Sequence, residues 1–548
     1  MSEMSSFAKT ILNQKYAHDL KDGGKETWKE VSQRVAKTIL KSAGANKSLI
    51  DQCIEYIEQR KFIPGGRYLY ATGRPFHQVN NCLLMRAGDS REGWAEHLQK
   101  CGMGLMTGAG IGGDYSDIRA EGKPIRKTGG IATGPLALMQ IINELGRGVM
   151  QGGSRRSALW AGLRWDHPDV MKFIVMKNWI PEVRAMKAKD FNFPATMDMT
   201  NISVQLNEEF FAAYNDEKHP HHTHAYMVFW AVVERMVRTG EPGFSIDLGK
   251  NHKETLRNAC TEVSSEDDSD VCNLGSINLA RVESLDEMKG LVEVAIAFLL
   301  AGTVYSDVPY TKVDMIRTKN RRLGLGLMGI HEWLLVRGKK YGPDAELDKY
   351  LEIYETSTKI AHGYSDKWDL SKSVKTRAIA PTGTIGIMAE TTTGAEPIFC
   401  AAFKRRYLKG GSWEYQYVLD PTAKRLIEEK GVNPDNIEDA YVLAGDIERR
   451  LAFQAHLQKY VDHGISSTIN LPPWGTELNN KDTIQKFGKT LLKYLPLLRG
   501  VTVYPDGSRS GQPLTPVRWH TAEKHIGEVF VEASDVCEIT GKGGSCGS

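Results

Sequence analysis

The hydrophobic pattern of the chain changes from helical to mixed near its start. Apolar residues recur at helical spacing in residues 26–43 and 47–60, with charged residues on the opposite faces, so the segment up to about residue 62 is predicted to be helical. A proline and two glycines at 64–66 end this pattern. From residue 81 to about residue 381, short apolar runs alternate with helix-like stretches and glycine-rich connections, which is typical of an α/β fold with parallel strands.

Two apolar segments in this region predict long helices. One covers residues 225–240 and ends at a glycine, and the other, residues 291–302, is apolar on most sides and is expected to be buried. The longest apolar stretch, residues 294–305, is too short to span a bilayer. After about residue 520 the pattern fades, and small polar residues predict a mobile C-terminal tail over 521–548.

The composition is that of an ordinary globular protein. Of the 548 residues, 41% are hydrophobic and 25% are charged, which excludes disordered, collagen-like and coiled-coil classes. The net charge is only +3, so neither nucleic acid nor an anionic membrane is expected as a partner. The N-terminus has acidic and lysine residues where a signal peptide needs a basic start and an apolar run, so we expect a cytoplasmic protein.

The eight cysteines are too few for a disulfide scaffold, and no pair has the CxxC spacing of a zinc ribbon or a thioredoxin motif. Cysteine chemistry must therefore come from residues that the fold brings together. The strongest candidate is NACTE at residues 258–262, because in an extended conformation Asn258, Cys260 and Glu262 project on one side. The alternative for Cys260 is a buried structural cysteine.

Two other motifs invite interpretations that their surroundings do not support. The histidine-rich residues 219–224 have no carboxylate or cysteine at ligand spacing, so no metal site is expected there. GLGLMG at residues 324–329 satisfies the dinucleotide pattern G-x-G-x-x-G, but the residues before it do not form a predicted strand. No dinucleotide site is expected.

Around the NACTE segment the chain resembles the catalytic subunit of ribonucleotide reductases. Its motifs are similar to those of the adenosylcobalamin-dependent branch and of small viral members. The motifs that carry the resemblance are NNCLLM (80–85), GAGIGGDYSDIR (108–119), QGGSRR (151–156), WDHPD (165–169), NACTE (258–262), CNLGSINL (272–279), RRLGLGLMGIHEW (321–333), APTGTIG (380–386) and VTVYPDGSR (501–509). They appear in the order of the family over about residues 60 to 510, so together they are a stronger signal than any one alone.

The resemblance implies a particular architecture. It is an α/β fold, a ten-stranded α/β barrel of two five-stranded parallel halves, with a central finger loop that carries Cys260. The resemblance divides the chain into an N-terminal helical region without an ATP cone (1–62), the catalytic barrel with its effector-binding helices and loops (63–520), and a tail with redox cysteines (521–548). Because a radical must be kept from water, a closed barrel interior is the expected housing.

The resemblance also implies a reaction. The 2′-OH of a ribonucleotide is replaced by hydrogen, for DNA synthesis, through a thiyl radical on Cys260. Glu262 would remove the 3′-OH proton as general base, and Asn258 would hold and polarise the substrate. Cys82 and Cys272 would supply two electrons and a proton and end as a disulfide.

Two cysteines of the tail complete the implied redox chemistry. Cys537 and Cys546 are interpreted as a shuttle that re-reduces the active-site disulfide by thiol exchange, and a thioredoxin- or glutaredoxin-type protein would reduce them in turn. The alternatives are incidental cysteines in a disordered end or a weak metal site.

The remaining implied roles concern nucleotides. The phosphates of a ribonucleoside di- or triphosphate would lie at Thr382, Gly383, Thr384 and Ile385, in a turn that begins an apolar stretch. Asn81 and Arg155 are further substrate positions. Asp89 and Arg119 match positions that bind the deoxynucleotide or ATP effector at the interface of a homodimer, and the alternative for them is a surface ion pair.

The source of the radical stays open. Enzymes with a separate metal-bearing subunit carry two adjacent tyrosines on a late barrel strand, whereas this chain has only Tyr504 as a candidate radical relay. That difference favours adenosylcobalamin, while the short chain favours a metal cofactor in a small radical-generating partner subunit. Competing classes are a glycyl-radical enzyme on a related barrel, which would need a glycyl strand that this sequence lacks, and a nucleotide-sensing homologue without activity.

Overall fold

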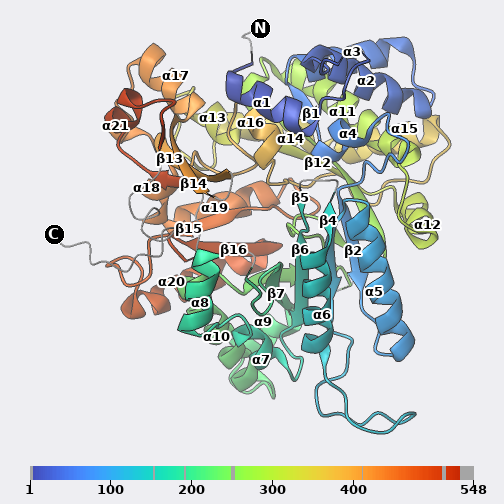
Figure 1. Cartoon of the computed structure of the whole chain (residues 1–548), viewed down its shortest axis with the longest axis vertical. Coiled ribbons are helices and arrows are strands. Elements are labelled where there is room, and N and C mark those ends of the chain that lie inside the picture. The colour runs from blue at the N-terminus through green and yellow to red at the C-terminus, as the bar shows by residue number, and fades with distance from the viewer. Residues whose placement is uncertain are drawn as a thin grey trace.

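One large sheet organises the molecule. The structure is a computed structural model that describes residues 4–21, 23–151, 155–190, 193–247, 253–409, 412–508 and 514–530 (Figure 1). The sheet has ten strands in the order β1-β11-β2-β3-β6-β7-β8-β16-β15, with β12 paired to β11. These strands are β1 (Phe62–Pro64), β2 (Cys82–Arg86), β3 (Gly110–Asp114), β6 (Leu159–Arg164), β7 (Thr200–Asn207), β8 (Gly243–Asp247), β11 (Asp270–Asn278), β12 (Leu323–Met328), β15 (Thr468–Leu471) and β16 (Gly500–Pro505).

Helices cover the sheet and fill the N-terminal region. They are α1 (Ser6–Lys15), α2 (Trp28–Ser42), α3 (Lys47–Glu58), α4 (Gly66–Ala71), α5 (Arg91–Met106), α6 (Pro135–Gly148), α7 (Val170–Val175), α8 (Pro181–Lys189), α9 (Glu208–Asn215), α10 (His222–Thr239), α11 (Leu285–Tyr305), α12 (Thr311–Asn320), α13 (Ile330–Leu335), α14 (Ala345–Glu355), α15 (Ser357–Lys367), α16 (Gly383–Ala389), α17 (Pro421–Lys430), α18 (Ala440–Ala444), α19 (Ile447–Gln458), α20 (Ile484–Tyr494) and α21 (Trp519–Lys524). The predicted α/β class is confirmed.

The first part of the sheet is a run of parallel strands. β2, β3, β6, β7 and β8 pair with one another in this order, and each pair is parallel. A helix follows most of these strands before the chain returns to the sheet, as parallel pairing requires. The prediction of parallel strands from the alternating pattern is therefore confirmed for this region.

The second part of the sheet runs in the opposite direction. β11 is antiparallel to β2 and β16 is antiparallel to β8, whereas β11–β12 and β15–β16 are parallel pairs. Between these two pairs the described residues form only single bridges, Leu325 with Arg377 and Ile379 with Ile465. No sheet closes among the described residues, so the expected ten-stranded barrel is not confirmed, and the architecture is a mixed α/β fold with one large sheet.

A small hairpin packs against strands β2 and β3 of this sheet. Its strands β9 (Leu256–Arg257) and β10 (Ser264–Ser265) are antiparallel, with Arg257 opposite Ser264, and residues 258–263 form its tip. A Cβ at Gly112 of β3 would lie 1.7 Å from the carbonyl oxygen of Arg257, and one at Gly110 would lie 3.2 Å from the Cβ of Ala259. The glycine-rich segment is therefore a strand whose missing side chains admit the hairpin.

The N-terminal helices share a core with the second part of the sheet. The helices predicted over 26–43 and 47–60 are α2 and α3, and Thr27 and Glu30 form a capping box at the start of α2. Both helices pack on α11, which is 21 residues long and therefore exceeds the apolar stretch seen in the sequence. By length and composition α11 could cross a membrane, but most of it is buried inside the protein.

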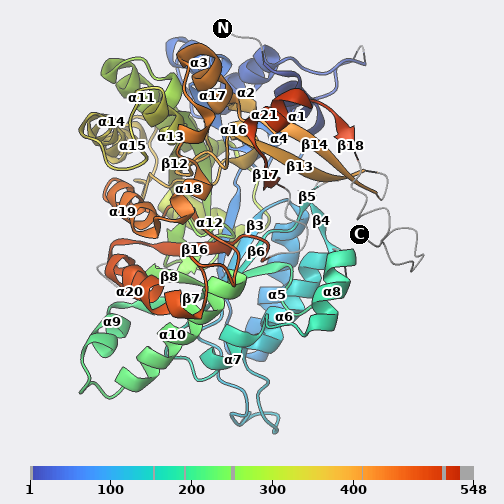
Figure 2. The same ribbon diagram turned by 90° about the vertical axis from the view of Figure 1, so that its left-hand side faces the viewer.

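A second, smaller sheet was not foreseen from the hydrophobic pattern. It contains β17 (Leu514–Pro516), β13 (Ala402–Lys409), β14 (Ser412–Leu419) and β18 (Val529–Phe530), all antiparallel. Figure 2 shows it beside α21 and away from α5 and α6. The pattern gave no element for α21 and β18, and residues 531–548 lie outside the described residues. A further hairpin pairs β4 (Met150–Gln151) with β5 (Arg155–Arg156).

The contact between β3 and the hairpin predicts the effect of a single methyl group. Gly112→Ala should lower the free energy of unfolding by about 3 kcal/mol, at the upper end of overpacking costs, because backbone atoms cannot move aside like the end of a side chain. Gly102→Ala in α5 is the matched control, since its Cβ would meet nothing closer than 4.0 Å. It should stabilise the helix by about 0.5–1 kcal/mol. Equal stabilities of the two variants in urea unfolding would contradict the prediction.

Candidate active site at the hairpin tip

The NACTE segment forms a turn at the tip of the hairpin. The backbone N–H of Thr261 donates to the carbonyl oxygen of Asn258 at 3.0 Å, and Thr261 has a positive φ of 67°. The expectation of an extended segment with alternating side chains is therefore wrong. The reason is the register of β9 and β10, which obliges residues 258–263 to reverse the chain direction.

The fold brings two distant cysteines together beneath this tip. Cys82 on β2 is directly opposite Cys272 on β11 in the antiparallel register. Such pairs have Cβ atoms about 4.5–5.5 Å apart, only slightly more than a disulfide needs. The Asn258 side-chain N–H donates to Cys82 Sγ at 3.0 Å, so the hairpin tip contacts this pair directly.

The two cysteines and Cys260 differ in their surroundings. Cys272 is fully buried, Cys82 is 5% exposed, and Cys260 is exposed. Burial raises the pKa of Cys82 and that of Cys272 well above the usual range, and the nearby Glu262, Cys272 and Cys260 act on Cys82 in the same sense. Both buried groups are therefore thiols at neutral pH. Cys260 is not enclosed as the closed-barrel expectation requires.

Glu262 is the buried acid of the tip. It is 1% exposed, and its Oε2 atom has no hydrogen-bond partner among the described residues. Burial raises the pKa of Glu262 to about 7, and the Asn258 amide opposes only part of that rise. A carboxylate with this pKa can accept a proton near neutral pH, which suits a general base. Its main chain is held by Gly464, whose N–H donates to the Glu262 carbonyl at 2.7 Å.

Apolar residues surround the cysteine pair. The cluster consists of Cys82, Leu84, Leu256, Val263, Cys272, Leu274 and Ala378, with Ala380 packed against it. A Cβ at Gly324 would lie 3.1 Å from Cys272 Sγ, so the first glycine of GLGLMG makes room for the sulfur. Residues 324–328 of this motif lie on the buried strand β12, and its last glycine, Gly329, is at the turn into α13.

Polar residues that the sequence analysis missed fix the base of the hairpin. Thr255 Oγ1 donates to Asp114 Oδ2 at 2.6 Å, and Gln205 Nε2 donates to the Thr255 carbonyl at 2.9 Å. On the other side, the Ser264 N–H donates to His463 Nδ1 at 3.2 Å. Asp114 lies within the motif GAGIGGDYSDIR, which was the one signal that could have pointed to it.

A buried ion pair also lies next to the cysteines and was missed. Arg322 Nε and Asp270 Oδ2 are 2.7 Å apart, and both side chains are almost fully buried. Ser265 Oγ of the hairpin donates to Asp270 Oδ2 at 2.7 Å. The pair therefore joins β11, the start of β12 and β10.

The residues expected to bind phosphate begin α16. Thr382 is in the left-handed conformation with a φ of 51°, and its Oγ1 accepts from the Gly394 N–H at 2.8 Å. The first helical residues are Gly383, Thr384 and Ile385. Asn81, the other expected contact, has its Oδ1 without a partner among the described residues. The segment leading to Thr382 packs on the cysteine cluster through Ala378 and Ala380.

The other predicted residues lie farther along the sheet. Arg119 Nε donates to both carboxylate oxygens of Asp89 at 3.0 and 2.9 Å, so these residues form the surface ion pair that was one of the alternatives. Arg155 is on β5, opposite Gln151 of β4. Tyr504 is on β16. Cys537 and Cys546 lie outside the described residues.

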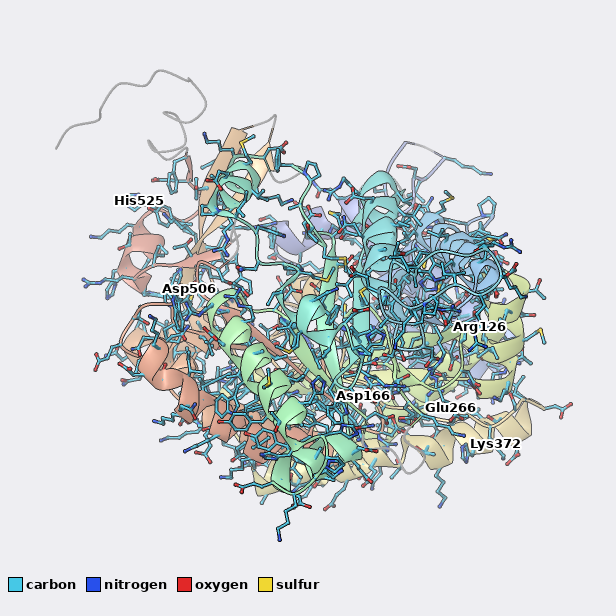
Figure 3. The ribbon with its side chains drawn as sticks, turned by 90° about the horizontal axis from the view of Figure 1, so that it is seen from below. Arg126, Asp166, Glu266, Lys372, Asp506 and His525 are labelled. Atoms are coloured by element: carbon cyan, nitrogen blue, oxygen red, sulfur yellow. The ribbon has the colours of Figure 1, made fainter. Side chains whose placement is uncertain are left out.

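Two cavities lie beside the sheet, and Figure 3 labels Asp506 of one and Asp166 and Glu266 of the other. The larger, of about 1090 Å³, is lined by Tyr504, Trp474 and Asp506 among others. The smaller, of about 710 Å³, is lined by Asp166, Glu266 and other polar residues at the carboxyl ends of β2, β6, β7 and β8. No group of three or more His, Cys, Asp or Glu residues that could hold a metal ion occurs in the described ranges.

The sequence matches the family described as ribonucleotide reductase, barrel domain, over residues 80–226, 215–368 and 371–494. The chain belongs to the ribonucleotide reductase family. It is 25% identical to the vitamin B12-dependent ribonucleoside-diphosphate reductase of Thermoplasma acidophilum, over 98% of this chain and 75% of the relative. A protein of Mycobacterium phage D29, provisionally named an adenosylcobalamin-dependent ribonucleoside-triphosphate reductase, is 23% identical over 98% of both chains.

A viral relative completes the comparison. The ribonucleoside-diphosphate reductase large subunit of Monkeypox virus is 23% identical over 74% of this chain and 63% of the relative. These findings confirm the prediction of a ribonucleotide reductase, and with it the oxidoreductase class.

The burial of Glu262 predicts a pH dependence of stability. Its pKa is about 7 in the folded protein and 4.5 as its ordinary value, so its contribution to stability is complete below about pH 4.5 and is lost as the pH rises to 7. Relative to Glu262→Gln, the wild type should lose up to about 3 kcal/mol over this range. Urea unfolding at several pH values measures the difference.

The matched control is Glu217→Gln, which replaces an exposed carboxylate. Its stability should follow the wild type at every pH. A Glu262→Gln variant that also follows the wild type would show that Glu262 is ionised in the folded protein.

Proposed function

We propose that this chain is the catalytic chain that reduces ribonucleotides to 2′-deoxyribonucleotides through a thiyl radical on Cys260. The observation that carries the proposal is the convergence of Cys82, Cys272, Asn258 and Glu262 at one hairpin tip that also bears Cys260. A sensing homologue without activity would have no need for this set. The family match favours the ribonucleotide reductase over the glycyl-radical alternative.

The buried groups divide the chemistry among them. The Cys260 thiyl takes the 3′ hydrogen atom of the ribose, and Glu262 accepts the proton of the 3′-OH near neutral pH. Both return to the sugar at the end of the reaction, which leaves the radical on Cys260. Asn258 is fixed from two sides, since its Oδ1 accepts from the Val263 N–H at 3.0 Å and its N–H contacts Cys82. The two thiols Cys82 and Cys272 give up two hydrogens in all: the 2′-OH leaves as water, the 2′ carbon gains hydrogen, and a disulfide forms.

The substrate phosphates belong at the start of α16 in this proposal. The N–H groups of Gly383, Thr384 and Ile385 have no partner within the first helical turn and can donate to phosphate oxygens. The packing of Ala378 and Ala380 on the cysteine cluster supports a location beside the reacting thiols. Asn81, with its free Oδ1, precedes Cys82 and would contact the sugar. Whether the substrate is a di- or a triphosphate is left to the assay.

The barrel of the family is part of this proposal. The extended segment 376–380 bridges to Leu325 of β12 on one side and to Ile465, just before β15, on the other. If this segment and the residues around Ile465 paired as full strands, they would join β12 to β15. The sheet would then close around the hairpin as a barrel. Such an enclosure would shelter Cys260 once substrate covers it.

We propose adenosylcobalamin as the source of the radical, as in the names of several relatives. The larger cavity exceeds the roughly 300–1,000 Å³ of pockets for drug-sized ligands and therefore has room for a large cofactor. Phe399, Tyr441 and Trp474 in its wall would hold the apolar faces of such a molecule. When bound, adenosylcobalamin supplies a one-electron oxidant for a thiol.

Tyr504 lies in the wall of this cavity, and β16, the strand that carries it, also reaches the hairpin tip. A Cβ at Gly500 would lie 3.7 Å from Thr261 Oγ1, and Gly500 and Tyr504 share one face of β16 because side chains alternate along a strand. Four residues of strand span roughly 13 Å. Tyr504 is therefore roughly 13 Å along β16 from the residue beside the tip, and in this proposal it would line the path of the radical from the cavity to Cys260. A metal cofactor in a separate subunit is the second candidate.

Regulation and re-reduction complete the proposal. Asp89 and Arg119 would open their ion pair to hold a deoxynucleotide or ATP effector. Arg155 on β5 would contact the substrate, so that the bound effector determines which substrate is accepted. The exposed apolar residues Met103, Met106 and Ile141 on α5 and α6 favour a homodimer through these helices. Cys537 and Cys546 would re-reduce the active-site disulfide, with a thioredoxin- or glutaredoxin-type protein as the final donor.

The first test is the activity of the purified chain with a reducing dithiol, with and without adenosylcobalamin. We expect conversion of ribonucleotides in its presence alone, and loss of turnover by several orders of magnitude in Cys260→Ser, because oxygen–hydrogen bonds are too strong for the exchange. Cys53→Ser in α3, far from the tip in the fold, is the control and should stay active. Turnover by Cys260→Ser would overturn the proposal. Activity that requires an added metal-bearing subunit would show that this subunit, and not adenosylcobalamin, supplies the radical.

A second test uses the pH dependence of the rate. Activity should fall below about pH 7, because Glu262 then holds a proton and cannot accept another. Glu262→Gln should lower kcat by about 10²- to 10⁴-fold and remove this acidic limb. A full rate in Glu262→Gln, or an unchanged limb in it, would exclude Glu262 as the base.

A further inference from the structure

The two sulfurs of the Cys82–Cys272 pair lie in unequal surroundings. Cys272 is fully buried, whereas Cys82 is 5% exposed and contacts the hairpin tip. A reagent that enters from the side of Cys260 therefore reaches Cys82 first. Access to Cys272 is blocked by β12, since even a methyl group at Gly324 would come within 3.1 Å of its sulfur.

A buried cation accompanies only one of the two sulfurs. Leu323 is paired with Asn273 in the parallel register of β11 and β12, so Arg322 lies beside Cys272. Its guanidinium reaches Asp270, which shares a face of β11 with Cys272 because the two are two residues apart. Arg322 Nη1 is buried and has no hydrogen-bond partner among the described residues. A cationic N–H without an acceptor is costly to bury, and a thiolate at Cys272 would reduce that cost.

The charges around the two sulfurs support this difference. Burial raises the pKa of Cys272, Arg322 is the largest influence that lowers it, and Asp270, Glu262 and Asp462 act against Arg322. Around Cys82, burial, Glu262 and the other two cysteines all raise the pKa, and only the Asn258 amide lowers it. Of the two sulfurs, Cys272 is therefore the one with a neighbouring cation that favours its thiolate.

We infer that the Cys82–Cys272 disulfide is opened in one direction only: a thiolate attacks Cys82 Sγ, and Cys272 leaves as the thiolate beside Arg322. This inference rests on the proposed function, which supplies the disulfide. Arg322 acts through Cys272, as a positioning residue for the leaving group.

The exchange balances with a dithiol as the reductant. The first thiolate forms a bond to Cys82 Sγ while the Sγ–Sγ bond breaks and its electron pair goes to Cys272, which then takes a proton from solvent. The second thiol of the dithiol attacks its own sulfur in the mixed disulfide and releases Cys82, which is protonated in turn. The dithiol ends oxidised by two electrons, and both protein cysteines end as thiols.

The experiment identifies the attacked sulfur directly. The full chain with Cys537→Ser and Cys546→Ser is oxidised, and peptide mapping establishes the Cys82–Cys272 disulfide. It is then treated briefly with the monothiol 2-mercaptoethanol and unfolded in N-ethylmaleimide. We expect mercaptoethanol on Cys82 and maleimide on Cys272. The reverse placement, or an equal division, overturns the inference and leaves the proposed function intact, whereas absence of the disulfide overturns both.

Arg322 is tested by the rate of reduction with dithiothreitol. Arg322→Met should slow the step roughly 3- to 10-fold and weaken the preference for Cys82, because the leaving thiolate loses its cation. Arg322→Lys keeps the charge and should restore most of the rate. The matched control is Arg321→Met, since Arg321 is also buried but donates to Thr303 of α11. A rate and a preference that are equal in Arg322→Met and Arg321→Met would overturn the role of Arg322. The mapping of the attacked sulfur does not depend on either arginine variant.

Discussion

The close approach of two main chains is the constraint on which the candidate site depends. The carbonyl of Arg257 lies where a side chain of Gly112 would be, so the hairpin touches the sheet backbone to backbone. Side chains of normal size would keep these segments several ångströms farther apart. At that separation Asn258 could not reach Cys82, and the tip would lose its contact with the cysteine pair. Glycine at this position therefore determines the geometry of residues far away in the sequence.

The interior that this contact creates is dry, and the dryness sets the chemical state of each group. Burial keeps Cys82 and Cys272 as thiols, which is the state that can donate hydrogen, and it brings the pKa of Glu262 close to neutrality. The same burial would be unfavourable for an isolated charge, so Arg322, the cation beside Cys272, is matched by a carboxylate, Asp270. One physical cause, burial away from water, thus shifts the pKa of the carboxyl and of both thiols in the same direction.

The sequence was informative where a local pattern decides the structure. The amphipathic periodicity of α2 and α3, the glycine that ends α10 and the alternation that indicates parallel strands all act over short stretches of chain. The resemblance to the family also selected Cys82, Cys260 and Cys272 correctly as one neighbourhood, although their meeting results from strand pairing across 190 positions.

The sequence was misleading or silent where tertiary contacts decide. NACTE was expected to be extended, but the pairing of β9 with β10 turns it back on itself. Nothing in the sequence indicated that the glycines of β3 make room for another backbone. Neither Asp270 nor Arg322 stands out in the sequence, because a buried ion pair is defined by its partner and its exclusion from water, and neither property is written in a single residue.

The exposure of Cys260 fits the burial of its neighbours once the order of events is considered. In the proposed reaction Glu262, Cys82 and Cys272 exchange protons or hydrogen atoms with the bound substrate, and their buried, fixed positions suit that role. Cys260, which in the proposal is first oxidised from outside, needs access on another side, and the tip of a turn provides it. A hairpin supplies both properties in consecutive residues: its ends are clamped by Thr255 and Ser264, and its apex projects. In a regular strand, residues two apart such as Cys260 and Glu262 point to the same face. Such a strand could not expose the first of them and bury the second.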